Sequence, residues 1–401
     1  MNSVNGKNAS DGNSSNSSNG DSCSCSYIIF SDLRFRKEAL EELKALFGDF
    51  KREKGSTEKF FVVTSATQKR EALSRFSKQN PVFIDNVIPL MLRTEFSNGD
   101  YSNVMDILSK RLDKKGSFAI EVVNVNSESG ENAKTIEVKV GTALEKLGFK
   151  ADLKDPDTFV YLILTGKSAL LGMLDKTETA KKRIDEFRHA SKQKDEKKIS
   201  RASFKLVEAI ENFGIDTKKL RIILDIGASP GSWSIHFSSL GAKVVAVDNA
   251  LLNYEKFQKD KHIVVAAEPR FVDQTKELLA KLEKPPEVIE INKIDTARFD
   301  ILHVRRRALD LPTHLLGSPK QFDLLAIDMN VEPEAAAEAA NHYSDLLKEH
   351  GYLLLTVKLF DRKAKENIKK ASEVLEKEFN SIRAKKLPHN RLELTIFATK
   401  R

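Results

Sequence analysis

The spacing of apolar residues predicts a small α+β unit near the start of the chain. Residues 27–30 and 60–64 are short apolar runs typical of strands, and residues 37–47 repeat leucine at helical spacing. A second helix is expected to follow and to end near Arg75. We therefore predict one α+β unit over residues 27–89.

A second α+β unit is predicted over residues 90–175. A helix carrying Val104 comes first, and a strand at residues 117–125 follows it. Residues 136–147 then repeat apolar positions at helical spacing, and residues 158–164 form another strand-like run. The two units together account for most of the first half of the chain.

After residue 220 the pattern changes to short, almost continuous apolar runs that alternate with helical segments. Such runs are typical of strands that are covered on both faces, and hence of a parallel α/β sheet. The predicted fold of residues 200–401 is therefore an open, Rossmann-like α/β domain. Its expected strands are residues 222–226, 243–247, 323–327 and 352–357.

Composition adds limits to this picture. The content of 40% hydrophobic and 31% charged residues is that of a globular protein, and no apolar run approaches the roughly 20 residues needed to cross a bilayer. Residues 1–26 are Ser, Asn and Gly with no apolar core of a signal peptide, so we predict a disordered tail. Because Cys23 and Cys25 lie there, we expect no disulfide, no metal site and a cytoplasmic location.

The net charge of +8 is spread over a long chain, but basic residues crowd in a predicted linker, residues 176–199, and at Arg305, Arg306 and Arg307. The linker also contains acidic residues, and alone it fits a solvated helix. A surface that follows phosphates is the better interpretation only if the neighbouring domain handles nucleic acid.

A glycine-containing turn follows the expected strand at residues 222–226. Its sequence G-A-S-P-G-S leads into a helix, whose free N–H groups favour a nucleotide-like ligand, and it differs from the G-x-G-x-x-G of dinucleotide sites. Asp248 ends the next strand, where a carboxylate accepts hydrogen bonds from ribose hydroxyls. Such a turn also occurs without any ligand. The candidate cofactor-binding residues are Asp225, Gly227, Ser229, Pro230, Gly231, Trp233 and Asp248.

Four further segments carry Lys, Asp, Lys and Glu in that order. They are S-R-A-S-F-K-L ending at Leu206, D-L-L-A-I-D-M ending at Met329, L-L-T-V-K-L-F ending at Phe360, and P-H-N-R-L-E-L-T ending at Thr395. With Pro230 and Trp233, they resemble the FtsJ-like RNA 2′-O-methyltransferases, and within them the type that methylates a cytidine of large-subunit ribosomal RNA. The resemblance implies S-adenosyl-L-methionine as cofactor and ribosomal RNA as partner.

The chemistry of ribose methylation explains these residue types. A 2′-hydroxyl is a weak nucleophile unless a base removes its proton during attack. The resemblance implies Lys358 as the activating residue, with Lys205, Asp328 and Glu393 positioning it. Two lysines close together in a desolvated pocket are expected to disfavour the charged form of one of them. Each of the four taken singly fits an ordinary surface or strand-end residue.

The unit at residues 90–175 resembles a THUMP domain, an RNA-binding module, and the unit before it is expected to be ferredoxin-like. The resemblance depends on S-F-A-I at residues 117–120 and on residues 151–157 leading into an aromatic strand. A generic α+β packing domain remains the alternative.

The chain departs from the FtsJ-like pattern in three places. Ser232 replaces the usual second glycine of the loop, an insertion lies between Asp248 and Asp328, and residues 304–307 are V-R-R-R where an acidic residue often holds the adenine. The insertion carries strand and helix signals at residues 262–267 and 269–282. The alternative function is a non-catalytic RNA-binding or ribosome-assembly factor that retains the fold.

Overall fold

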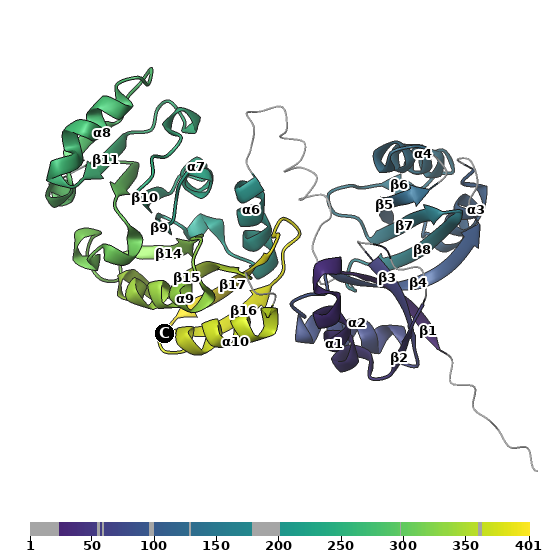
Figure 1. Ribbon diagram of the computed structural model, residues 1–401. Coiled ribbons are helices and arrows are strands. Elements are labelled where there is room, and N and C mark those ends of the chain that lie inside the picture. The colour runs from purple at the N-terminus through teal and green to yellow at the C-terminus, as the bar shows by residue number, and fades with distance from the viewer. Residues whose placement is uncertain are drawn as a thin grey trace, which may run out of the picture.

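The computed structural model describes residues 24–53, 57, 60–95, 100–127, 130–178, 201–296, 298–359 and 363–401. The predicted tail up to residue 23 and nearly all of the predicted basic linker lie outside these residues. The described chain forms an N-terminal α+β part and a C-terminal α/β part (Figure 1). Both fold classes predicted from the sequence are confirmed.

The N-terminal part is built on one sheet with the strand order β2-β3-β1-β4-β8-β7-β5-β6. Four helices accompany it in the described residues: α1 Arg36–Phe47, α2 Lys69–Gln79, α3 Ser102–Arg111 and α4 Ala133–Lys146. The strands are β1 Cys25–Phe30, β2 Phe50–Arg52, β3 Phe60–Ser65, β4 Asn86–Glu95, β5 Ser117–Ser127, β6 Lys150–Ala151, β7 Thr158–Gly166 and β8 Ser168–Asp175.

Strand β4 joins the two predicted units. Its first residues pair antiparallel with β1, with Ile88 opposite Ile28, and its later residues pair antiparallel with β8, with Arg93 opposite Leu170. The predicted boundary between residues 89 and 90 falls inside this strand. A single sheet therefore runs through both units.

The start of the fold corrects the predicted position of one cysteine. Cys25 and Ser26 belong to β1 and not to a disordered tail, because the ladder with β3 continues to Cys25 opposite Ser65. The Cys25 thiol lies 3.6 Å from the Gln68 side-chain oxygen. The folded part of the chain thus contains one free thiol among its described residues.

The C-terminal sheet has the strand order β12-β11-β13-β10-β9-β14-β15-β17-β16. The strands from β12 to β15 in this order are all parallel, whereas β17 pairs antiparallel with β15 and with β16. The strands are β9 Ile222–Ile226, β10 Lys243–Val247, β11 Ile263–Ala267, β12 Glu287–Glu290, β13 Ile301–Arg305, β14 Phe322–Ile327, β15 Leu347–Lys358, β16 Phe379–Lys385 and β17 Glu393–Lys400.

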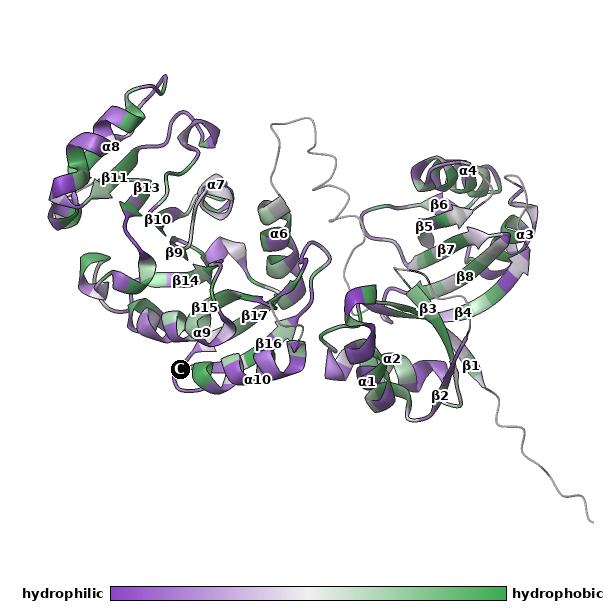
Figure 2. Cartoon of the chain, in the orientation of Figure 1, coloured by the Kyte–Doolittle hydropathy of each residue, from purple (hydrophilic) through white to green (hydrophobic). Residues whose placement is uncertain are grey.

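Helices cover both faces of this sheet, as the continuous apolar strands predict (Figure 2). Ile223 and Val244 face the side of α6 Arg201–Phe213 and α7 Ser232–Ser239. Leu224 and Val245 face the opposite side. Helices α9 Pro333–His342 and α10 Ala364–Leu375 pack there.

The insertion predicted after Asp248 extends the sheet beyond β13. It contributes β11, helix α8 Val272–Leu279 and β12, so its strand and helix signals correspond to real elements. Since β11 is parallel to β13, the carboxyl end of β11 lies at the same edge of the sheet as the carboxyl ends of the other parallel strands. Within the described chain, no helix is both long and apolar enough to span a bilayer.

The end of β16 and the residue that follows it contact the N-terminal part. Lys385 Nζ donates to the carbonyl oxygens of Pro81 and Ile84, at 2.5 and 2.8 Å. Lys386 donates its backbone N–H to Val82 O at 3.0 Å. Both lysines are at most 4% exposed, so this contact is a packed interface.

Candidate active site

The turn after β9 requires glycine at its first position. Gly227 has a φ of +75°, and a Cβ there would lie 2.8 Å from Met329 Cγ and 2.9 Å from the Asp328 carbonyl oxygen. The turn and the end of β14 are therefore in backbone contact. Gly231, with a φ of +102°, ends the turn as the N-cap of α7.

Asp248 and the turn together border a hollow of about 430 Å³. One Asp248 oxygen accepts the Ser229 backbone N–H at 3.0 Å, and the other accepts the Ala250 N–H at 2.8 Å. Gly227, Ser229 and Asp248 line this hollow, as the candidate assignment requires, and Asp328 lines it from the β14 end.

Another candidate cofactor residue, Asp225, lies in β9 just before the turn. Asp225 is 1% exposed and accepts the Ser234 hydroxyl at 2.5 Å. Burial raises the pKa of Asp225 to about 7, the Ser234 hydrogen bond opposes this, and the charges of Asp328 and Asp248 add to it. Asp225 is thus placed to support the turn, and it does not line the hollow.

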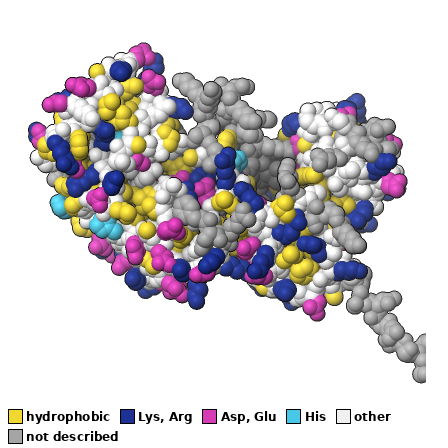
Figure 3. Space-filling model, in the orientation of Figure 1, with side chains coloured by type: hydrophobic (Ala, Val, Ile, Leu, Met, Phe, Trp, Pro, Cys, Tyr) yellow, Lys and Arg dark blue, Asp and Glu magenta, His cyan; other side chains and the backbone are white. Residues whose placement is uncertain are grey.

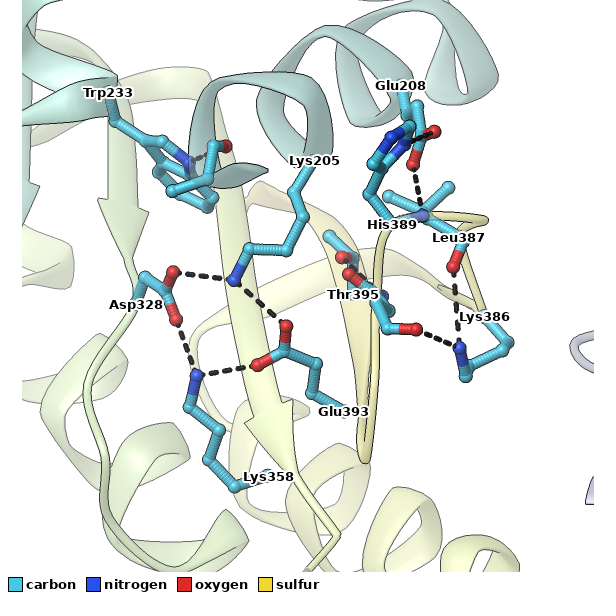
Figure 4. A network of polar contacts seen from close by, with 12 residues as sticks. Lys205, Glu208, Trp233, Asp328, Lys358, Lys386, Leu387, His389, Glu393 and Thr395 are labelled. Atoms are coloured by element: carbon cyan, nitrogen blue, oxygen red, sulfur yellow. Dashed lines mark hydrogen bonds and ion pairs between the residues drawn. The ribbon is translucent and has the colours of Figure 1, made fainter. Parts of the chain in front are cut away.

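Trp233 connects the turn to helix α6. Its Nε1–H donates to the Ala202 carbonyl oxygen at 2.7 Å (Figure 4). Pro230 accepts the Asn253 backbone N–H at 2.9 Å. Neither residue lines the hollow, so their contribution is to the shape of the turn and to the position of α6.

Lys205, Asp328, Lys358 and Glu393 converge in one closed cluster, called here the tetrad (Figure 4). Lys205 Nζ lies 2.8 Å from Asp328 Oδ2 and 3.0 Å from Glu393 Oε1. Lys358 Nζ lies 2.8 Å from Asp328 Oδ1 and 2.7 Å from Glu393 Oε2. Each amine therefore sits between two carboxylates, and each carboxylate between two amines.

The fold explains why residues so distant in sequence meet. Asp328 follows β14 and Lys358 ends the neighbouring parallel strand β15, so both reach the same sheet edge. Glu393 begins β17 and stands opposite Lys358 in the antiparallel ladder. Lys205 comes down from α6 to complete the tetrad (Figure 4).

The electrostatics of the tetrad differ from the expectation of a lysine with a lowered pKa. Burial acts to lower the pKa of Lys358, but the charges and hydrogen bonds of Asp328 and Glu393 outweigh it and the net shift is upward. Burial likewise acts to raise the pKa of Asp328, and the two amines bring it below its ordinary value. The reason is geometric, because each amine contacts carboxylates and not the other amine.

A second polar pair supports the tetrad and was not predicted. Glu208, on the α6 turn after Lys205, accepts the His389 backbone N–H at 3.0 Å and also bonds to its ring Nδ1. The His389 ring stacks on Phe204 with 4.9 Å between centroids. This pair fixes α6 against the segment that leads to Glu393. No local pattern signals it, since the partners are 181 residues apart.

The basic run at residues 305–307 lines the cofactor hollow only through Arg307. Arg305 turns away, donating to Thr275 Oγ1 at 2.7 Å. Leu309 and Asp310 follow the run and line the hollow together with Arg307. The lining of the hollow therefore includes a carboxylate, Asp310, which follows the basic run. In the described residues, no cluster of His, Cys, Asp and Glu is suited to holding a metal ion.

Comparison with known proteins agrees with this geometry. Residues 199–393 match the family of FtsJ-like methyltransferases. A ribosomal RNA large subunit methyltransferase E from Wolbachia sp. subsp. Brugia malayi is 31% identical over 127 residues, which cover 31% of this chain and 57% of the relative. The enzyme of the same name from Wolbachia pipientis wMel is 33% identical over 31% of this chain and 65% of the relative.

The chain thus spans less than two thirds of these relatives' length. Among solved structures, TrmN from Thermus thermophilus aligns over 94% of this chain and 99% of its own, with 16% identity and a TM-score of 0.33. The family match covers the loop and all four members of the tetrad. Residues 199–393 are therefore similar to the FtsJ-like methyltransferases, a class that uses S-adenosylmethionine.

Proposed function

We propose that the protein transfers a methyl group from S-adenosylmethionine to a ribose 2′-hydroxyl of RNA, with ribosomal RNA as the substrate class. The observation that carries this proposal is the closed tetrad beside the cofactor hollow. Asp328 belongs to both, since it lines the hollow and holds Lys205 and Lys358. A nucleophile activated at the tetrad is therefore adjacent to the cofactor.

S-adenosylmethionine fits the hollow through polar groups of complementary kinds. Asp248 offers carboxylate oxygens to ribose hydroxyls, Gly227 permits close backbone approach, and Asp310 offers an acceptor near the adenine. Asp225, Pro230, Gly231 and Trp233 hold the turn in place, and Ser229 links it to Asp248. When bound, the cofactor supplies an electrophilic methyl group on a positively charged sulfur.

The cofactor site has its own test. We expect Asp248→Ala to weaken S-adenosylmethionine binding by roughly 1 to 3 kcal/mol in calorimetry, because ribose hydroxyls would lose their acceptor. Asp216→Ala is a control, since Asp216 caps a surface turn by accepting the Lys218 N–H at 3.1 Å. Equal affinities of both variants and the parent would remove Asp248 from the site.

Lys358 is the member of the tetrad best placed to accept the proton. Its side chain is 17% exposed, whereas that of Lys205 is 5% exposed, so a substrate hydroxyl reaches Lys358 more readily. Lys358 must first lose its own proton. The positive charge of Lys205 nearby and the exclusion of water both favour that loss. Lys205, Asp328 and Glu393 orient the amine, and alignment of hydroxyl oxygen, methyl carbon and sulfur lowers the rest of the barrier.

The proposed ribosomal substrate is supported by the two relatives, both of which are ribosomal RNA large subunit methyltransferases. We propose that the N-terminal part acts as a THUMP-like RNA-binding region, that the basic linker assists it, and that the protein works in the cytoplasm. The non-catalytic alternative keeps the hollow but gives no reason for a complete tetrad.

The test exploits the chemistry of the product. A 2′-O-methyl group blocks alkaline cleavage of the adjacent phosphodiester bond. The full chain would be incubated with total ribosomal RNA and S-adenosylmethionine carrying a labelled methyl group. We expect the label in alkali-resistant dinucleotides, and no label with Lys358→Ala. Label in mononucleotides would indicate base methylation, and no incorporation with the parent protein would favour the non-catalytic factor.

A further inference from the structure

The insertion forms a second hollow of about 590 Å³ with the end of β13. Arg270 and Phe271 line it from the insertion, and Arg305, Arg306 and Arg307 line it from the β13 end. It adjoins the cofactor hollow, because Arg307 and two further residues line both. The tetrad and the cofactor hollow do not account for this arrangement.

The second hollow is basic. Its four arginines face two carboxylates, Glu268 and Asp310. Glu268 holds Arg270 at 2.8 Å and Arg306 at 3.5 Å. Since each guanidinium has five N–H donors, both keep donors for a ligand. The Arg307 side chain makes no hydrogen bond or ion pair with any residue that the structure describes, although its backbone carbonyl oxygen accepts the Asp310 N–H at 3.2 Å.

An aromatic ring accompanies these charges. Phe271 is 40% exposed, and the Arg270 guanidinium lies 4.7 Å from its ring centroid. Arginines for phosphates and an exposed ring for a base are the combination by which proteins hold single-stranded nucleic acid. At this end of the molecule, dark blue basic side chains lie among yellow hydrophobic and magenta acidic ones (Figure 3).

The second hollow also lies in line with the tetrad. The strand order from the insertion inward is β11-β13-β10-β9-β14-β15, and these strands all end at one edge. The second hollow is at the ends of β11 and β13, and the tetrad is at the ends of β14 and β15. Four strand spacings of roughly 4.8 Å separate them, or ~19 Å, which a few nucleotides of extended strand can cover.

We propose that the second hollow binds a single-stranded segment of the substrate RNA a few nucleotides from the target ribose. Arg270 and Arg306 contact its phosphates and Phe271 stacks on a base. The inference rests on the proposed function for the identity of the substrate, but the binding itself does not require methyl transfer.

The experiment measures binding and turnover separately, with the full chain. The binding probe is a fluorescently labelled oligouridylate, and the turnover assay uses total ribosomal RNA. We expect Phe271→Ala to weaken oligouridylate binding about five- to a hundredfold, the range for loss of one stacked base, and Phe271→Tyr to retain it. Arg270→Ala should reduce the slope of the logarithm of the binding constant against the logarithm of salt concentration by about 0.7, the contribution of one phosphate contact to a single strand.

The matched control is Lys276→Ala, which removes an exposed charge from α8 outside the lining of the hollow. It should leave RNA affinity unchanged, and all variants should bind S-adenosylmethionine like the parent. In turnover, the Phe271→Ala effect should appear in KM and not in kcat. Parent-like oligouridylate affinity of Phe271→Ala and Arg270→Ala would overturn the inference. Absence of methyl transfer by the parent protein would instead overturn the proposed function and leave the binding result standing.

Discussion

Two pairs of buried lysines in this chain meet different partners. Lys205 and Lys358 lie between carboxylates in the tetrad, whereas Lys385 and Lys386 lie at the N-terminal interface, mainly among carbonyl oxygens. The directions of the pKa shifts differ accordingly. The pKa of Lys358 is raised, while burial lowers that of Lys386 and the charge of Asp32, 3.4 Å away, offsets it only in part.

The difference shows that burial alone does not determine the state of a lysine. Full opposite charges at hydrogen-bonding distance overcome the cost of desolvation, and carbonyl dipoles with one more distant carboxylate do not. In the tetrad, an amine that has to lose a proton is therefore held charged until something changes its surroundings. The following predictions test this comparison.

The largest effect is expected at Lys358, where the comparison concerns chemistry. Lys358→Ala should lower the single-turnover rate by about 10²- to 10⁴-fold, the usual contribution of a positioned acid–base group, with nearly unchanged affinities. Lys358→Arg should be almost as inactive, because arginine keeps its charge and does not release a proton. The measurement is methyl transfer with saturating enzyme.

Lys348→Ala is the matched control, since Lys348 also lies on β15 and pairs with Asp323 at 2.6 Å but at the opposite end of the strand. A near-normal rate of Lys358→Arg would mean that Lys358 acts only as a fixed charge.

The pH profile of the rate adds a second test. Because the pKa of Lys358 is raised, its neutral amine is scarce near neutral pH and becomes more abundant only as the pH rises. The rate should therefore increase through the alkaline range.

An intermediate effect is expected when one carboxylate of the tetrad is neutralised. Asp328→Asn leaves Glu393 as the one carboxylate that the two amines share. The pKa of Lys358 should then fall, because burial lowers it and less negative charge remains to oppose burial. The free energy of unfolding should decrease by on the order of 3 kcal/mol, because a mostly buried charge loses its partner. Urea unfolding gives the stability, and NMR titration of the lysine side chains gives the pKa.

Glu349→Gln provides the comparison for this stability change. Glu349 pairs with Lys320 at 2.5 Å, but both side chains are about two thirds exposed, so the loss of this ion pair should change the free energy of unfolding very little. If Asp328→Asn cost no more than Glu349→Gln, the carboxylates would not be what holds Lys358 charged.

The smallest effect is expected at the interface. Lys386→Met removes a charge that burial disfavours, which stabilises the fold, and it also removes hydrogen bonds to carbonyl groups, which destabilises it. The net change in the free energy of unfolding should therefore be within about 1 kcal/mol near neutral pH. The sign of the pH dependence is more informative. The folded pKa of Lys386 is lowered, so the native state of the parent loses this proton before the unfolded state does.

The parent should therefore gain stability relative to Lys386→Met as pH rises from the folded pKa towards the ordinary value of lysine. Lys358 contributes with the opposite sign, because its raised pKa means stability that is lost above the ordinary value. Unfolding by urea at several alkaline pH values measures the difference. A constant difference between parent and variant would show that Lys386 is not perturbed.

Local pattern was sufficient to predict most strands of the C-terminal sheet, but not β12, β13 and β16. Strands β9 and β10 have the predicted bounds, because an apolar run buried on both faces begins and ends sharply. The order of residues along the chain also placed Asp248, Asp328 and Lys358 at strand ends. Parallel strands then bring such ends to one edge whatever the details of packing.

Features that depend on contacts between distant residues were not predictable in this way. Strand β4 contains Pro89, which argues against a central strand, and it changes partner near that residue. Glu208 pairs with His389 across most of the domain, and Asp310 reaches the hollow only through the turn after β13. The pKa direction of Lys358 likewise depends on which charges surround it.

Strand β4 determines how the first half of the molecule can be divided. Asn86–Glu95 pairs with β1 through its first residues and with β8 through its later ones, and a Cβ on Gly172 of β8 would lie 2.9 Å from the Pro89 carbonyl oxygen. Cleavage between residues 89 and 90 would leave each product with half a strand and an unpaired apolar edge. The two units should therefore melt as one cooperative block, and a fragment meant to fold independently needs to keep the chain from Cys25 to Glu178 intact.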